Sequence, residues 1–173
     1  MIEIRQLSAL EASGYTSALA EVLVDCVAGG ASVNFMAPYS QECAESFFAG
    51  VVRSVERSDR LLFAAFDGER LVGTVQLVTA MPPNQPHRAE VAKLLVHRCA
   101  RGRGVGARLM RELEQTARGM GKTLLTLDTV TGSDGERLYR RLGWTSAGTI
   151  PNYALFPDGT PCATTIFWKE PTG

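Results

Sequence analysis

Residues 88–129 carry the pattern that most limits how this chain can fold. The apolar run AEVAKLLVH is followed closely by the glycine- and arginine-rich segment ARGRGVG, and then by a helical pattern marked by Val105, Leu109 and Leu113. A second apolar run, KTLLTLDT, comes next. A strand, a helix and a strand in this order predict a β-α-β unit whose two strands are parallel.

The first half of the chain predicts an antiparallel arrangement instead. IEIRQL at 2–7 alternates like a strand, and amphipathic helical patterns follow a capping box at Ser8 and Glu11 and an N-cap at Ser40. Asp67-Gly68 separates two apolar runs and indicates a hairpin. With two closing strands near 144–150 and 163–169, the chain is predicted to be an α/β (α+β) protein with a mixed, mostly antiparallel sheet.

Charge and composition narrow the classes of partner. Lys+Arg and Asp+Glu are both 18, so the whole molecule has no net attraction for nucleic acid or an anionic membrane. Five arginines and no acid lie between Arg98 and Arg111, so positive charge is concentrated there. No apolar run approaches about 18 residues, and a cytoplasmic location is expected. The cysteines form no metal or redox pattern, and no metal is expected: Cys26, Cys43, Cys99 and Cys162.

The glycine-arginine turn predicts an anion site. The first N–H groups of a helix lack partners inside the helix, and the positive end of the helix dipole lies beside them. Gly102, Gly104 and Gly106 would leave this backbone accessible, while Arg101 and Arg103 could add charge-assisted hydrogen bonds. The extent of the segment favours a pyrophosphate over a single phosphate.

Two nucleotide-binding motifs compete for this segment. A Walker A loop is excluded because Gly121-Lys122-Thr123 opens a strand and position 116 is threonine. The dinucleotide fingerprint fits Gly102-x-Gly104-x-x-Ala107, with Asp128 ending the next strand. However, only residues 129–173 follow, which are too few to complete a doubly wound sheet. A nicotinamide oxidoreductase therefore remains the weaker alternative.

A third pattern is the cofactor motif of the GCN5-related N-acetyltransferase (GNAT) superfamily. Its Gln/Arg-x-x-Gly-x-Gly/Ala form is matched by residues 101–106, RGRGVG, and the later stretch ERLYRRLGW resembles the superfamily's usual tyrosine-containing ending. The stretches HRAEVAKLLV, ARGRGVG, LDTVTGS and LYRRLGW look most similar to the tabtoxin resistance protein-like acetyltransferases. This resemblance implies one N-acetyltransferase domain over 1–173, the GNAT fold with helices on both faces of the sheet, and acetyl-CoA (coenzyme A) as cofactor.

The resemblance also implies where the cofactor binds. The strand before the turn should hold the pantetheine arm by main-chain hydrogen bonds, and the two parallel strands should separate near their middle. Ser133, which with Glu136 predicts a second capping box, stands near the place where the superfamily commonly has an asparagine. The resulting cofactor-binding set is Leu94, Leu95, Val96, Arg101, Gly102, Arg103, Gly104, Val105, Gly106, Ala107 and Ser133.

Three residues are predicted to be catalytic. Glu90 is the first candidate for the general base, in the strand-start setting where relatives place a glutamate. Asp128 is a second base or orients the amine, and Tyr139 matches the tyrosine that protonates the leaving thiolate. The competing interpretations are a solvated carboxylate for Glu90, a turn-forming Asp128 and core packing for Tyr139.

The expected function is acetyl-CoA-dependent N-acetylation of a small-molecule primary amine (an amino acid, toxin or antibiotic-like compound), with a resistance role. Asn34, Phe35 and Tyr39 lie in the early loop that, by analogy, binds this substrate. Protein lysine or N-terminal acetylation is the alternative enzyme, and a non-catalytic acyl-CoA sensor is the alternative of another class. Neither nucleic acid nor membrane is an expected partner, and the superfamily's frequent dimers allow a homodimer.

Overall fold

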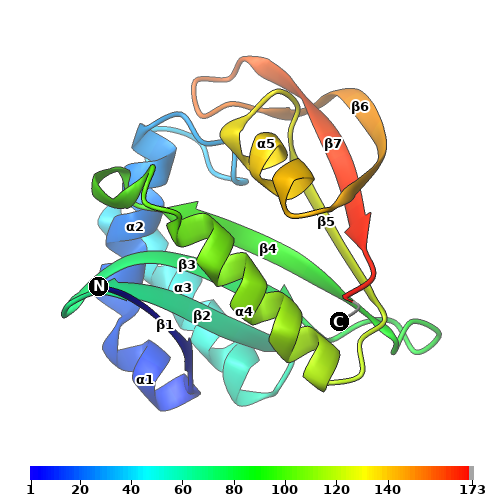
Figure 1. Ribbon diagram of the computed structural model, residues 1–173. Coiled ribbons are helices and arrows are strands. Elements are labelled where there is room, and N and C mark those ends of the chain that lie inside the picture. The colour runs from blue at the N-terminus through cyan, green and yellow to red at the C-terminus, as the bar shows by residue number, and fades with distance from the viewer. Residues whose placement is uncertain (172–173) are drawn as a thin grey trace.

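A seven-stranded sheet organises residues 1–171, the part of the chain described by the computed structural model (Figure 1). Its order is β1-β2-β3-β4-β5-β7-β6, and every neighbouring pair is antiparallel except β4 and β5. The predicted mixed sheet with one parallel crossover is therefore confirmed. The strands are β1 (Ile2–Leu7), β2 (Arg60–Asp67), β3 (Arg70–Val78), β4 (Arg88–Val96), β5 (Leu124–Val130), β6 (Thr145–Leu155) and β7 (Pro161–Lys169).

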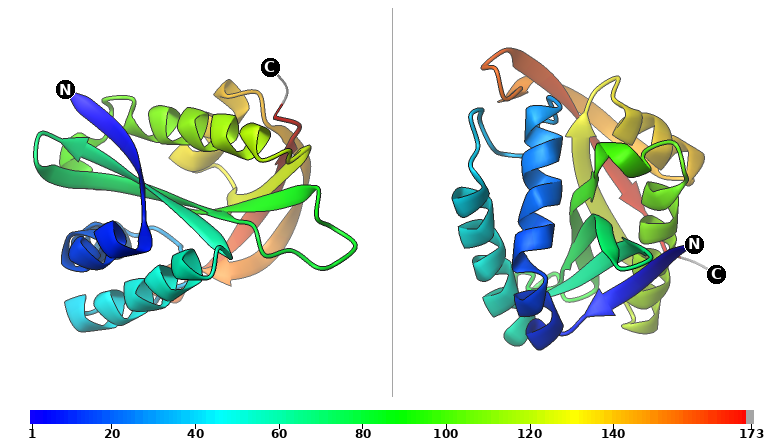
Figure 2. Two further views of the ribbon diagram at one scale, coloured as in Figure 1. Left: turned by 90° about the horizontal axis from the view of Figure 1, so that it is seen from below. Right: turned by 90° about the vertical axis from the view of Figure 1, so that its left-hand side faces the viewer.

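Helices cover both faces of this sheet, as the two views in Figure 2 show. One face carries α1 (Ala9–Gly14), α2 (Thr16–Ala28) and α3 (Gln41–Glu56), and the other carries α4 (Val105–Gly119) and α5 (Asp134–Arg141). A short 3-10 helix, η1 (Arg98–Ala100), follows β4. The single helix expected before residue 29 is divided at Tyr15 into α1 and α2.

The apolar run of β2 explains why the sheet lies between two helical layers. Leu62 and Ala64 pack with α2 and α3, whereas the alternate residues Phe63 and Ala65 pack with α4. Because successive side chains of a strand point to opposite faces, a continuous apolar run is expected where both faces are covered. Two apolar cores result, one on each side of the sheet.

The parallel strands β4 and β5 remain paired over only three residues. Arg88–Glu90 pair with Leu124–Thr126, and β4 then continues to Val96 without further pairing to β5. The strands diverge from this point (Figure 1). A β-bulge lies in the diverging part of β4, where the register with β3 shifts and Lys93 has a φ of 53°. The separation that the resemblance implied is thus present, and it opens the sheet at its centre.

Candidate active site

The turn before α4 provides an open backbone cradle. Gly102 and Gly104 have φ values of 74° and 76°, and a Cβ atom added to either would meet nothing within 4 Å. Gly104 is the N-cap of α4, and no side chain caps this helix end. The N–H groups of the first turn are therefore free of side-chain partners, beside the positive end of the helix dipole. These features fit a pyrophosphate.

Gly106 is small for a different reason. A Cβ atom at Gly106 would lie 3.1 Å from Cδ2 of Leu138 and 3.9 Å from side-chain atoms of Leu94 and Val96. Gly106 therefore allows α5 and the end of β4 to pack closely against α4. Its place in the cofactor motif thus also has a packing explanation.

The arginines around the turn already have protein partners. Arg103 donates to Asp67 Oδ2 at 2.7 Å, at the β2–β3 turn. Arg101 Nε donates to the Val96 carbonyl at 3.1 Å, and Arg98 pairs with Asp25 on α2. These contacts fix the turn to α2 and to the hairpin. Direct binding of phosphate by Arg101 and Arg103 stays a prediction, because both side chains already bond to protein groups.

The unpaired side of β4 is the predicted place for the pantetheine arm. Leu95 and Val96 pair with Thr74 and Gly73 of β3 on one side, while nothing in residues 1–171 extends the β5 pairing beyond Glu90 on the other. Main-chain groups directed toward the gap are suited to an extended ligand chain. The Val96 carbonyl is an exception, because it already accepts a hydrogen bond from Arg101.

Glu90 and Asp128 lie beside the point where the strands separate. Glu90 is the last β4 residue paired with β5, opposite Thr126, and Asp128 is two residues further along β5 on the same face. Both residues are exposed, and Glu90 Oε2 is 3.8 Å from Arg88 Nη1. The two predicted carboxylates are thus close along the sheet and accessible.

Tyr139 on α5 is buried in the core, and the charge of Asp128 also affects its pKa. Its ring centroid lies 6.0 Å from that of Trp144 and 6.1 Å from that of Phe167. Burial raises the pKa of Tyr139 above its ordinary value, and the negative charge of Asp128 adds to the increase. The phenol is therefore protonated at neutral pH, as an ordinary tyrosine is, and it is a weaker acid than one in water. Core packing and proton donation are compatible here.

The loop at residues 29–40 is fixed over the diverging end of β4. Ser32 Oγ donates to the Leu155 carbonyl at 2.6 Å, and the Ala37 amide donates to the Pro157 carbonyl at 3.0 Å. Within the loop, the rings of Phe35 and Tyr39 are 4.5 Å apart, and Phe35 also packs against Phe47 of α3. Asn34 is exposed, with a φ of 75°.

Lys93 is a site residue that sequence reasoning missed. Its Nζ atom lies 5.7 Å from the centroid of Phe35, so the β4 bulge and the early loop meet here. Burial lowers the pKa of Lys93, partly offset by the negative charge of Asp128. The sequence feature that could have identified Lys93 is that it is the single cation inside the apolar segment VAKLLV.

Ser133 has a structural role at the start of α5. Its Oγ accepts the Glu136 amide at 3.1 Å and lies 3.4 Å from Thr129 Oγ1. The predicted cap is therefore confirmed. A cofactor contact by Ser133 would have to share this hydroxyl.

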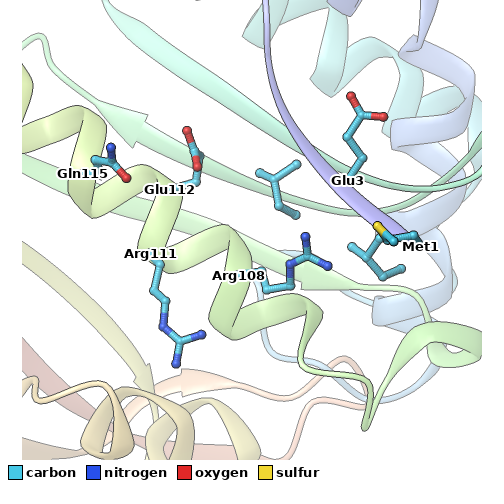
Figure 3. Close-up of a pocket in the computed structure, with 8 residues that line it drawn as sticks. Met1, Glu3, Arg108, Arg111, Glu112 and Gln115 are labelled. Carbon is cyan, nitrogen blue, oxygen red and sulfur yellow. The ribbon is translucent and has the colours of Figure 1, made fainter.

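One surface depression lies away from the strand opening. It has a volume of about 740 Å³ and runs between β1 and the side of α4 (Figure 3). Its charged and polar lining residues are Glu3, Arg108, Arg111, Glu112 and Gln115.

Among residues 1–171, no helix combines the length and apolar character needed to cross a membrane.

Comparison with known proteins identifies the family. The model of the acetyltransferase (GNAT) family matches residues 18–144. An N-acetyltransferase from Staphylococcus aureus Mu50 is 17% identical, with 99% of each chain covered and a TM-score of 0.82. A putative phosphinothricin N-acetyltransferase is 20% identical, with complete coverage of both chains and a TM-score of 0.81.

A third structure was solved with its cofactor. This putative acetyltransferase from Salmonella typhimurium, in complex with acetyl-CoA, is 16% identical, covers 99% of this chain and 94% of its own, and has a TM-score of 0.79. At these identities the solved structures establish the shared fold. The family match confirms the predicted acyltransferase class and its acetyl-CoA cofactor: this chain belongs to the GNAT acetyltransferase family.

Proposed function

We propose that this protein transfers the acetyl group of acetyl-CoA to the primary amine of a small molecule. The observation that carries this proposal is the pair of accessible carboxylates, Glu90 and Asp128, at the point where β4 and β5 separate. An amine with a pKa near ~10.4 reaches the site as an ammonium ion. Two carboxylates attract such a cation and can accept its proton.

Residues at the other end of β4 are suited to hold the cofactor. The backbone of residues 102–106 and the uncapped first turn of α4 would bind the pyrophosphate. The free side of β4 would bind the pantetheine arm. When bound, acetyl-CoA supplies an activated acetyl group. Positioning would then contribute most of the rate, since effective molarities reach ~10⁵–10⁸ M.

The protein side chains would manage the protons. Glu90 removes a proton from the acceptor ammonium, directly or through a water molecule, while Asp128 holds and orients the amine. The alternative assignment exchanges these two roles. Tyr139, which is protonated at neutral pH, would donate its proton to the leaving thiolate. General acid-base help of this kind contributes typically ~10²–10⁴-fold.

The early loop favours a small acceptor over a protein. Ser32 and Ala37 attach this loop to Leu155 and Pro157, at the turn between β6 and β7, and Phe35 extends from it to the β4 bulge. Because this loop is attached to the β6–β7 turn and also contacts β4, it would leave less room in the acceptor site for a peptide backbone. Protein lysine or N-terminal acetylation remains the second candidate. The similarity to a putative phosphinothricin N-acetyltransferase supports a detoxification or resistance role.

A thiol-release assay with a panel of amines tests this function. Wild-type protein should release CoA when a small amine is added, and Glu90→Gln should lower kcat by about 100-fold or more. The acetyl-CoA dissociation constant of Glu90→Gln should stay within a few-fold of wild type. Binding without amine-dependent release would identify an acyl-CoA sensor. Release with peptides but not with small amines would identify a protein acetyltransferase.

A further inference from the structure

Lys93 occupies an unusual backbone position inside the proposed acceptor site. A φ of 53° is a left-handed conformation that residues other than glycine rarely adopt. It occurs at the β4 bulge, where β3 and β4 change register. Bulges next to active sites commonly redirect a side chain. Here the redirected side chain reaches the ring of Phe35, on the loop above the sheet.

The Lys93 ammonium group has no anionic partner in contact with it. Within residues 1–171 it forms no salt bridge and no side-chain hydrogen bond, although it is partly buried. The charge of Asp128 attracts it and that of Arg60 repels it, and its pKa is lowered chiefly by burial. A partly desolvated cation without a paired anion is unfavourable by itself. A bound anion would correct this imbalance.

Neighbouring donors increase the positive character of the same face. Arg60 donates to Gln76 Oε1, yet Arg60 Nε and Gln76 Nε2 are buried without a hydrogen-bond partner. Gln76 lies opposite Ala92, next to the bulge. Two buried donors next to the bulge, Arg60 Nε and Gln76 Nε2, therefore lack an acceptor. Gln76 is fully buried, whereas Lys93 and Arg60 are both partly exposed, and Lys93 is the one of these two that lies on the separated part of β4.

We propose that Lys93 binds the carboxylate of an amino-acid acceptor whose amine faces Asp128. Lys93 and Asp128 form no salt bridge, and both lie just beyond the last paired residues of β4 and β5, so the two ends of a zwitterion can be bound where these strands separate. Its carboxylate would meet Lys93 Nζ and its ammonium group would meet Asp128. An acceptor that lacks the carboxylate would leave the lysine unpaired, which is the basis of discrimination. This inference rests on the proposed function and specifies its substrate class.

Matched variants and paired acceptors test this role. The acceptors are L-methionine, L-phenylalanine and L-glutamate, each compared with its α-carboxamide. The variants are Lys93→Met, Lys93→Gln and Lys93→Arg, with Lys122→Met as control because Lys122 lies outside the site and bonds the Pro86 carbonyl. Thiol release gives kcat and KM. Calorimetry gives the dissociation constant of each acceptor from the enzyme–CoA complex, independently of turnover.

Wild type should prefer at least one amino acid over its carboxamide by about thirtyfold or more in both KM and dissociation constant. Lys93→Met and Lys93→Gln should remove this preference by raising the KM and the dissociation constant of the amino acid, with little effect on those of its carboxamide. Lys93→Arg should retain part of it, and Lys122→Met all of it. Because the wild-type comparison needs no variant, the inference stays testable if a substitution prevents folding.

Two results would overturn the inference while leaving acetyl transfer intact. One is a wild-type enzyme that accepts carboxamides as well as every amino acid. The other is a Lys93→Met variant that loses kcat equally with both kinds of acceptor, which would assign Lys93 to proton transfer. Failure of the proposed function itself has a different signature, namely acetyl-CoA binding without thiol release with any amine.

Discussion

Replacing Gly104 by alanine separates backbone strain from cofactor binding. Gly104 has a φ of 76° and open space around the position of a Cβ atom, so the substitution causes strain but no collision. The left-handed conformation costs a non-glycine residue roughly 1–2 kcal/mol. In a domain of this size, about 1 kcal/mol lowers Tm by about 2–4 °C, so we expect a decrease of about 2–8 °C.

Gly121 provides the matched control at the other end of the same helix. It also has a φ of 76°, and a Cβ atom there would likewise meet nothing within 4 Å. Gly121→Ala should therefore cost about as much stability as Gly104→Ala. It lies far along α4 from the proposed pyrophosphate cradle, so acetyl-CoA binding should not change.

Acetyl-CoA affinity is the quantity that distinguishes the two variants. A hydrogen bond to a charged group contributes about 1.5–3 kcal/mol, and each 1.4 kcal/mol is tenfold in the dissociation constant. If the Cβ atom of Gly104→Ala displaces the pyrophosphate from one amide, its dissociation constant should rise by about 10- to 100-fold. Calorimetric titration with acetyl-CoA measures this. Equal affinities for Gly104→Ala and Gly121→Ala would refute the cradle and the cofactor geometry built on it.

Three further predictions follow from contacts in and around the site. Tyr139→Phe should keep the core packed and leave Tm nearly unchanged while lowering kcat by about tenfold or more, as steady-state assays would reveal; an unchanged kcat would leave Tyr139 only a packing role. Gly106→Ala should not give the gain of about 0.5–1 kcal/mol that alanine usually brings within a helix, because its Cβ atom would lie 3.1 Å from Leu138 Cδ2, and thermal melts that show the full gain would contradict this packing. Burial raises the pKa of Asp25, but hydrogen bonds from the Arg98 amide and guanidinium outweigh this, so its pKa lies below the ordinary value. Asp25→Asn should therefore be less stable than wild type at pH 7, and urea titrations should show the difference disappearing as the pH falls below about 4, whereas a constant difference would argue against the ion pair.

Local sequence patterns were sufficient for most of the elements and for the glycine turn before α4. The apolar period distinguished β4 from α4, and serine caps marked the starts of α1, α3 and α5. The glycines of residues 102–106 identified the turn, because a left-handed backbone and close ligand approach both favour glycine. These features depend on residues a few positions apart, so they can be read along the chain.

The acceptor end depended on register and long-range packing. Sequence spacing placed Glu90 and Asp128 on two strands. They lie beside an opening only because the pairing of β4 with β5 ends at Glu90 and Thr126. A one-residue bulge in β4 redirected Lys93, and nothing local in VAKLLV indicates that the lysine meets Phe35 from a distant loop.

The arginines of the turn illustrate the same division. Their concentration was visible in the sequence, and it indicated a phosphate site. Their partners were not visible, since Arg98 pairs with Asp25 and Arg103 with Asp67 across long chain separations. The sequence by itself determined the elements, the backbone cradle and the family, because these follow from local conformation and spacing. The tertiary structure decided which charges are paired and which remain free, because pairing depends on where the strands separate and which loops cover them.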